Sequence, residues 1–235
     1  MIFTNSNYIF AFSHRKDGNM SFFYGDTSVS LCNRQVFLGN LGLDYRDLVC
    51  ARQVHGSSIE IVEDAQRGRG ALSSEDALWG KDVLVTQTPH LPLAVFTADC
   101  LSIFLFSPQG PTIALVHAGW RGTRDEIVKK TVIFMENHLG VHPKTLQAIL
   151  CPAIRTCCYE VSAEFQGFFS YGLINRGNRF FLDLAEVNLQ QLLEAGVNKD
   201  NIKDVQNCTF CQGDYFSFRR EGLSSGRIIS VGMLR

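Results

Sequence analysis

The sequence predicts an α/β fold organised as a single domain over residues 1–235. Hydrophobic residues make up 46% of the chain and charged residues 19%, a balance that suits a packed core and argues against disorder. Runs of β-branched and aromatic residues, typical of buried strands, share the chain with segments whose apolar residues recur at helical spacing. No repeat, low-complexity segment or linker divides the chain, so we expect one domain rather than two.

Charge and hydropathy exclude two classes of partner. The formal net charge of -1 provides no field that would attract nucleic acid or an anionic membrane. No apolar stretch approaches the roughly 18–20 residues needed to cross a bilayer, and the first residues lack the pattern of a signal peptide. The eight cysteines are therefore expected to be reduced core or site residues. These features predict a cytoplasmic enzyme with a small-molecule substrate.

Apolar alternation and turn-forming residues predict the elements of the amino-terminal part. They are a strand at residues 2–12, a polar turn at 13–19, a short helix at 30–41, strands at 48–54 and 59–62, and a surface loop at 63–81. His55 and Gly56 form the turn between the last two strands. Glycine allows a positive φ there, so the turn can aim the His55 side chain into a site.

The middle of the chain carries the strongest signals. Buried strands are predicted at residues 91–97, 101–106 and 113–116. A helix is predicted at 121–139, because its apolar residues share one face. These residues are Val128, Val132, Met135 and Leu139. Gly140 is expected to end the helix as a left-handed cap.

The last third contains a second well-marked helix. Asp183 is its predicted N-cap, Glu186 follows three residues later, and Gly196 is expected to stop it. Residues 215–220 are predicted to form a strand with two aromatic side chains on one face.

Three residues predict a metal site. Cys100 and His117 each lie at the end of a strand-like run, and His55 lies in the turn described above. Zinc binds thiolate and imidazole readily, and catalytic zinc sites usually keep three protein ligands and one open position. Spacing alone is weak evidence, because a buried cysteine is more often a small core residue and a histidine in a turn is more often structural.

Neighbouring residues suggest roles in catalysis and substrate binding. Asp99 is either a proton-transfer carboxylate near Cys100 or a turn-forming acid. Arg121, at the start of the predicted helix, could hold an anionic substrate group, although a surface ion pair is commoner. Trp120 could stack on a base or cover the core.

A second metal site is considered and disfavoured. Cys208 and Cys211 have the spacing of a zinc knuckle, and Cys157 with Cys158 could supply a partner pair. Adjacent cysteines fit a tetrahedral cage poorly, so we do not predict a structural zinc there. The histidines at 90, 138 and 142 are assigned surface roles, and no P-loop, G-x-G-x-x-G, G-x-S-x-G or H-E-x-x-H motif is present.

Five motifs stand in the order of a known family. They are QVHG at 53–56, TADC at 97–100, HAGWRG at 117–122, CCYEV at 157–161 and SFRR at 217–220. On these motifs the chain resembles the YfiH/YlmD laccase-domain family over nearly its whole length. The resemblance implies a single α/β (α+β) sandwich with mixed β-sheets, related to bacterial deamidating toxins of the CNF1 type.

The same resemblance implies a zinc-binding purine nucleoside enzyme. It would cleave adenosine, guanosine, inosine and methylthioadenosine with phosphate and would also deaminate adenosine. The family's metal ligands correspond to His55, Cys100 and His117. Cys100 and Asp99 are the catalytic candidates, and Arg121 and Arg15 are candidates for holding phosphate.

Three segments depart from the family pattern. They are residues 16–21, residues 150–152 and the loop at 221–227. None includes a metal ligand, so they bear on substrate preference rather than on metal binding.

Other functions remain as alternatives. Some bacterial relatives are described as peptidoglycan editing factors, and the same three ligands could hydrolyse a mis-incorporated muropeptide precursor. A non-enzymatic binding module is less expected with an open three-ligand site. A true laccase is rejected, because six histidines cannot supply a type 1 copper site and a trinuclear cluster. Copper could still occupy the site adventitiously.

Overall fold

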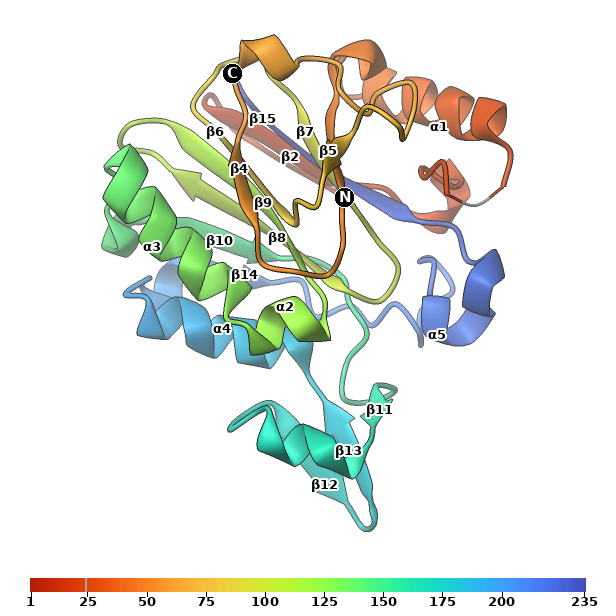
Figure 1. Ribbon diagram of the computed structural model, residues 1–235, viewed down its shortest axis with the longest axis vertical. Helices are drawn as coiled ribbons and strands as arrows, with labels where there is room; N and C mark the ends of the chain where they lie inside the picture. The colour runs from red at the N-terminus through yellow and green to blue at the C-terminus, as the bar shows by residue number, and fades with distance from the viewer. Residues whose placement is uncertain (24) are drawn as a thin grey trace.

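Two six-stranded mixed sheets form the centre of the computed structural model, which describes residues 1–23 and 25–235 (Figure 1). The first sheet has the order β1 (Ile2–Thr4), β2 (Tyr8–Phe12), β15 (Ile228–Leu234), β7 (Leu93–Thr97), β3 (Val49–Arg52), β5 (Leu78–Trp79). The second has the order β14 (Ile202–Asp204), β10 (Gln147–Leu150), β8 (Leu101–Ser107), β9 (Thr112–Ala118), β6 (Val83–Thr86), β4 (Ile59–Ile61). The predicted α/β sandwich with mixed sheets is confirmed.

Helices cover both outer faces of this pair of sheets. The α-helices are α1 (Thr27–Gly39), α2 (Trp120–Arg124), α3 (Ile127–Leu139), α4 (Leu184–Glu194) and α5 (Phe218–Glu221), of which α1, α3 and α4 provide the covering layers. Leu38 of α1 packs with residues of the first sheet, whereas α3 and α4 lie side by side over the second (Figure 1). The layer order is therefore helix, sheet, sheet, helices.

Alternation along the central strands explains this layering. In β8, Phe104 and Phe106 face the first sheet, whereas Ile103 and Leu105 face the helices. All seven residues of β8 are buried. A strand covered on both faces needs no polar side, which is why the stretch 103–106 of β8 is a continuous apolar run.

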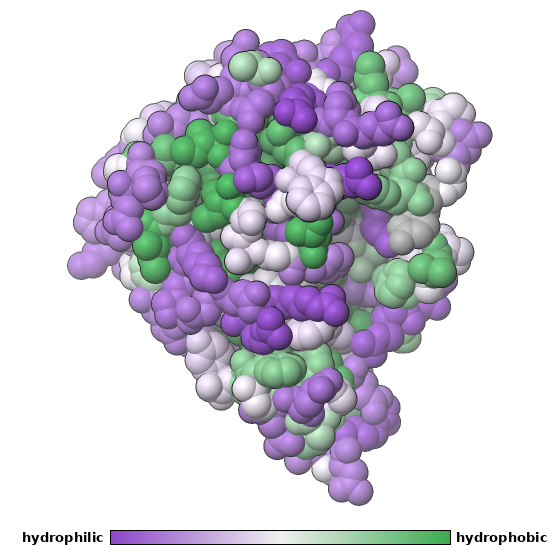
Figure 2. All heavy atoms as spheres, in the orientation of Figure 1, coloured by the Kyte–Doolittle hydropathy of each residue, from purple (hydrophilic) through white to green (hydrophobic). Residues whose placement is uncertain are grey.

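A small third sheet projects from the body. Its order is β11 (Glu160–Val161), β13 (Arg179–Leu182), β12 (Leu173–Arg176). Figure 2 shows hydrophobic residues where this projection meets the body, and further hydrophobic patches among hydrophilic residues on the body itself. Phe165, Phe169 and Leu182 of this region belong to the core under α3 and α4.

Several sequence predictions are confirmed. The helix at 30–41, the strands at 48–54, 59–62, 91–97, 101–106 and 113–116, and the helix capped by Asp183 all occur within a few residues of their predicted bounds. The Asp183 carboxylate accepts from the amides of Ala185 and Glu186, and Gly140 adopts the predicted left-handed conformation. The 63–81 segment is mostly irregular, although it contributes β5.

Three predicted elements are wrong. Residues 2–12 form the hairpin β1–β2 rather than one strand, because the Asn5 side chain accepts from the amides of Asn7 and Tyr8 and reverses the chain. The helix at 121–139 is broken into α2 and α3 by Glu126, which has φ 58°. Residues 215–220 do not form a strand, because Ser217 caps the short helix α5.

A buried arginine fixes the loop after β2. Arg34 of α1 is 2% exposed and donates to the carbonyl oxygens of Met20, Gly70 and Ala71 at 2.7–2.9 Å. Replacing Arg34 by methionine is expected to lower the free energy of unfolding by about 3–5 kcal/mol, because three buried carbonyls lose their partner. Arg46→Met is the control, since Arg46 is exposed and pairs only with Asp44. Equal denaturation midpoints for the two variants would contradict this role.

In the part of the chain that the structure describes, no helix combines the length and apolar character needed to cross a bilayer.

Candidate metal centre and active site

Strand pairing brings two of the predicted ligands together. β8 and β9 are antiparallel, with Leu101 opposite Ala118 and Ser102 opposite His117. Cys100, just before β8, therefore lies beside His117 near the end of β9. The chain reverses between β7 and β8 at Asp99, which has φ 86°, and this break frees the Cys100 side chain from the pleat.

A buried carboxylate positions the third ligand. Asp82, directly before β6, accepts from the backbone amides of Val54, His55 and Gly56 at 3.3, 3.0 and 2.8 Å. Three amides around one carboxylate hold the turn that carries His55, whose φ is 61°. This turn joins β3 of the first sheet to β4 of the second. Asp82 therefore fixes the turn in which the chain, carrying the candidate ligand His55, crosses from the first sheet to the second.

The same carboxylate orients His117. Asp82 Oδ1 lies 2.7 Å from His117 Nδ1, and the His117 amide donates to the Asp82 carbonyl at 2.8 Å. Both side chains are almost fully buried. Because Nδ1 is engaged by Asp82, Nε2 is the nitrogen left for a metal ion, an arrangement common to histidine ligands in proteins.

The three side chains fit one metal ion. Their ligand atoms lie within 4.8 Å of one another, and the rings of His55 and His117 meet edge to face with centroids 4.8 Å apart. A Cβ on Gly119 would lie 2.9 Å from His55 Cδ2 and 3.2 Å from the Cys100 sulfur, so a side chain at 119 would crowd both ligands. One thiolate and two imidazoles leave a four-coordinate ion one open position.

Mutual electrostatics prepare the centre for a cation. Burial would raise the pKa of the Cys100 thiol, but His117 and His55 outweigh it and lower that pKa to about 6. Burial would lower the pKa of His117, whereas Asp82 and the Cys100 sulfur raise it to about 9. Between these values the metal-free centre holds a thiolate beside an imidazolium.

These pKa values predict how metal affinity depends on pH. Between pH 7 and 9 Cys100 is already a thiolate, while His117 carries a proton that must leave before Nε2 can bind. The affinity for Zn²⁺ is therefore expected to rise about tenfold per pH unit over this range and to level off above it. Competition with a chromophoric chelator would measure the slope. An affinity independent of pH from 7 to 9 would contradict the pairing of His117 with Asp82.

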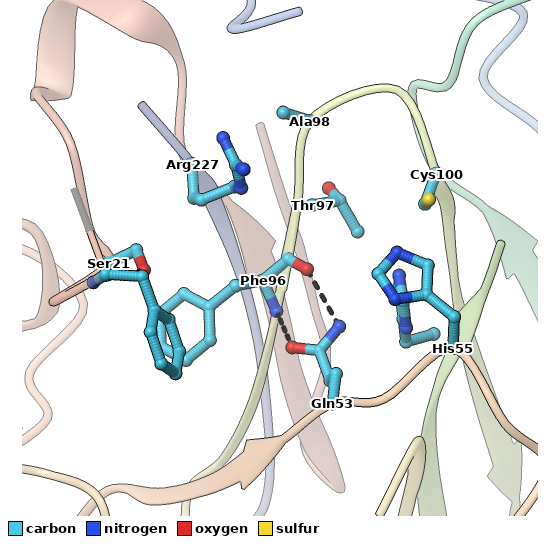
Figure 3. Close-up of a pocket in the computed structure, with 10 residues that line it drawn as sticks. Ser21, Gln53, His55, Phe96, Thr97, Ala98, Cys100 and Arg227 are labelled. Atoms are coloured by element: carbon cyan, nitrogen blue, oxygen red, sulfur yellow. Dashed lines mark hydrogen bonds between the residues drawn. The ribbon is translucent and has the colours of Figure 1, made fainter. Parts of the chain in front are cut away.

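Two cavities meet at the centre. The first has a volume of about 340 Å³ and is shown in Figure 3, where His55 and Cys100 lie at one end and Arg227 and Ser21 at the other. Its walls include Phe23, Phe96 and His117. The Gln53 side chain exchanges two hydrogen bonds of 2.8 Å with the backbone of Phe96 and so extends the pairing of β3 with β7 (Figure 3).

The second cavity has a volume of about 270 Å³ on the other side of the same ligands. His55 and Cys100 line it as well as the first. Its other lining residues are Asp99, Trp120, Arg121, Ile154, Tyr159, Leu184, Phe218 and Arg219. Both cavities therefore combine aromatic side chains with arginine, and the second contains two arginines, Arg121 and Arg219.

Of the residues predicted to act in catalysis or phosphate binding, Asp99 and Arg121 line a cavity at this centre, whereas Arg15 does not. Asp99 lines the second cavity, and its oxygens accept from Thr209 Oγ1 and the Arg219 amide at 2.6 Å each. Arg121 lines the same cavity, with its guanidinium over the Trp120 ring. Arg15 instead lines a separate cavity and forms an ion pair with Glu221.

Sequence reasoning missed two features of the site. Asp82 was not singled out, because it precedes a strand that was not predicted. Arg219 was not assigned a role, because nothing in the local sequence links it to a metal site. It lies 119 residues after Cys100 in the sequence, and α5 places it in the second cavity. The only local sign of Asp82 is a lone acid directly before the apolar run Val83–Val85.

The fold and the site define the class of this protein: a mixed α/β sandwich with a candidate metal centre of one cysteine and two histidines. The chain belongs to the family described as multi-copper polyphenol oxidoreductase laccase, whose sequence pattern matches residues 4–235. The resemblance to YfiH and YlmD proteins is confirmed.

Named relatives and solved structures agree with this assignment. Adenosine deaminase RL5, from an unknown prokaryotic organism, is 33% identical over 89% of this chain and 84% of its own. Purine nucleoside phosphorylase YlmD of Geobacillus stearothermophilus is 32% identical over 90% and 81%. The structure of YfiH from Bacillus licheniformis superposes with a TM-score of 0.94 at 28% identity, covering 97% of this chain and 93% of that one. With relatives of this similarity named as enzymes, the chain is an enzyme.

Proposed function

We propose that this chain is a zinc-dependent purine nucleoside enzyme. It would cleave adenosine, inosine, guanosine and methylthioadenosine with phosphate and would deaminate adenosine. The observation that carries the proposal is the cluster of His55, Cys100 and His117 beside two cavities, each of which has aromatic side chains and at least one arginine in its lining. The names of the relatives, an adenosine deaminase and several purine nucleoside phosphorylases, support the substrate class.

The ligand atoms favour zinc over copper. Zinc binds cysteine and histidine side chains, and its catalytic sites have three protein ligands with the fourth position open. A blue-copper site adds a weak axial ligand such as methionine, and no methionine lines either cavity among the described residues. When bound, zinc would supply Lewis acidity toward a water molecule or a substrate oxygen.

Other residues of this chain would hold the purine ring, hold the phosphate and transfer the proton. Phe23 and Phe96 provide flat apolar surface in the first cavity, where a purine ring can be held. Arg121 and Arg219 place positive charge in the second cavity, where phosphate can be held beside the ribose. Asp99 is the proposed acid–base group. Its bonds from Thr209 and the Arg219 amide fix the carboxylate in that cavity next to Cys100.

A product assay tests this proposal. Purified protein of known metal content is given adenosine with and without phosphate, beside a Cys100→Ala variant. Adenine formed only with phosphate shows phosphorolysis, and inosine formed without phosphate shows deamination; either product must disappear in the variant. Absence of turnover from zinc-loaded protein would refute the nucleoside assignment, and muropeptide precursors would be the next substrates.

A further inference from the structure

A second cluster of potential metal ligands lies away from the candidate active site. The sulfur atoms of Cys157, Cys158, Cys208 and Cys211 all lie within 4.8 Å of one another. The Cys211 sulfur is 3.3 Å from that of Cys157 and 3.0 Å from that of Cys158. The structure thus brings together two cysteine pairs that are about fifty residues apart in the sequence. The adjacency of Cys157 and Cys158 had favoured the opposite prediction.

Backbone pairing holds the two halves of the cluster in place. The segment after β10 runs beside the segment after β14, because the Ala153 amide donates to the Asn207 carbonyl and the Thr209 amide donates to the Ala153 carbonyl. The Arg155 guanidinium donates to both oxygens of Asp204 at 3.0 and 2.6 Å. Both cysteine pairs are therefore anchored to the edge of the second sheet.

The adjacent cysteines lie in a turn, not in a strand. The amides of Cys158 and Tyr159 both donate to the Arg155 carbonyl, at 2.9 and 2.8 Å. In a strand, neighbouring side chains point to opposite faces, but a turn removes that constraint. This geometry lets the sulfur atoms of Cys157 and Cys158 both reach Cys211.

The arrangement fits one tetrahedral ion better than a disulfide. The Cys211 sulfur is close to two other sulfur atoms, of which a disulfide could use only one. Zinc bound at about 2.3 Å to four thiolates separates neighbouring sulfur atoms by about 3.8 Å, within the spread of this cluster.

We propose that Cys157, Cys158, Cys208 and Cys211 bind a second zinc ion with a structural role. All four positions are filled by protein, which is typical of structural zinc and leaves no place for substrate. The ion would tie the base of the projecting sheet, which begins with β11, to the segment that runs from Cys208 to α5. That segment carries Thr209 and leads to Arg219 in α5, and the hydrogen bonds of these two residues hold Asp99. The second zinc would therefore stabilise one wall of the second cavity.

Metal content tests the proposal without any activity measurement. Protein purified under reducing conditions without chelator is expected to contain two zinc ions per chain. Cys208→Ser and Cys100→Ala are each expected to retain one, and Cys32→Ser, which changes an exposed cysteine of α1, is expected to retain both. One zinc in the wild type that is lost with Cys100→Ala would overturn the proposal.

Two further measurements guard against a variant that fails to fold. X-ray absorption of the wild-type protein is expected to give about 2.5 sulfur ligands per zinc on average, the mean for a four-cysteine site and a one-cysteine site. Zinc bound at the Cys100 centre alone would give about one sulfur ligand per zinc. Mass spectrometry after alkylation under denaturing conditions is expected to find all four cysteines as thiols. A disulfide involving Cys211 in freshly purified, reduced protein would also overturn the proposal. Neither result depends on whether the enzyme acts on nucleosides.

Discussion

Replacing Cys100 by alanine is expected to remove the active-site zinc and to lower kcat/KM for the nucleoside reaction by about 10³-fold or more. A catalytic metal contributes several kcal/mol to transition-state stabilisation, and each 1.36 kcal/mol is about tenfold in rate. Cys100 supplies the one thiolate of the centre, and its sulfur contributes to the raised pKa of His117. Loss of this sulfur leaves only the two imidazoles and lowers the pKa of His117.

Cys32→Ala is the matched control for this variant. Cys32 lies exposed on α1 and contacts neither cavity among the described residues. Zinc content, steady-state rates and circular dichroism would be measured on both proteins. A Cys100→Ala protein that is folded, lacks one zinc and keeps its full rate would show that the chemistry does not use this centre.

Replacing Asp82 by asparagine is expected to lower zinc affinity by about 10–100-fold, the usual effect of removing a group that orients a metal ligand. The Asp82 carboxylate accepts from three backbone amides and pairs with His117. An amide of the same shape has only one acceptor oxygen and turns an N–H toward some of these donors. Both His55 and His117 should therefore lose their fixed orientation, although neither is mutated.

The second effect of this variant is on pH dependence. Because Asp82 helps to raise the pKa of His117, the rise of zinc affinity should level off at lower pH in Asp82→Asn than in the wild type. Asp64→Asn is the control, since Asp64 is an exposed partner of Arg67. Equal affinities for wild type and Asp82→Asn, with unchanged pH profiles, would show that Asp82 does not position the ligands.

Local sequence predicted the elements whose signal lies within a few residues. The strands β7, β8 and β9 are mainly apolar, and α4 begins after an aspartate that caps its first turn. Helix α3 followed from apolar residues on one face, and Gly140 marked its end. The break at Glu126 could not be predicted, because no glycine or proline stands at this position although its φ is positive.

The sequence by itself determined which residue types are available to bind a metal ion and, through family motifs, which positions are the candidates: His55, Cys100 and His117. Only the tertiary structure decided that Asp82 joins His55 to His117, since this depends on the pairing of β4, β6 and β9, which are distant in the chain. The four-cysteine cluster was likewise decided by the pairing of the segments after β10 and β14. Residue type and spacing carry local chemistry, whereas convergence of distant side chains depends on strand register, which no short segment contains.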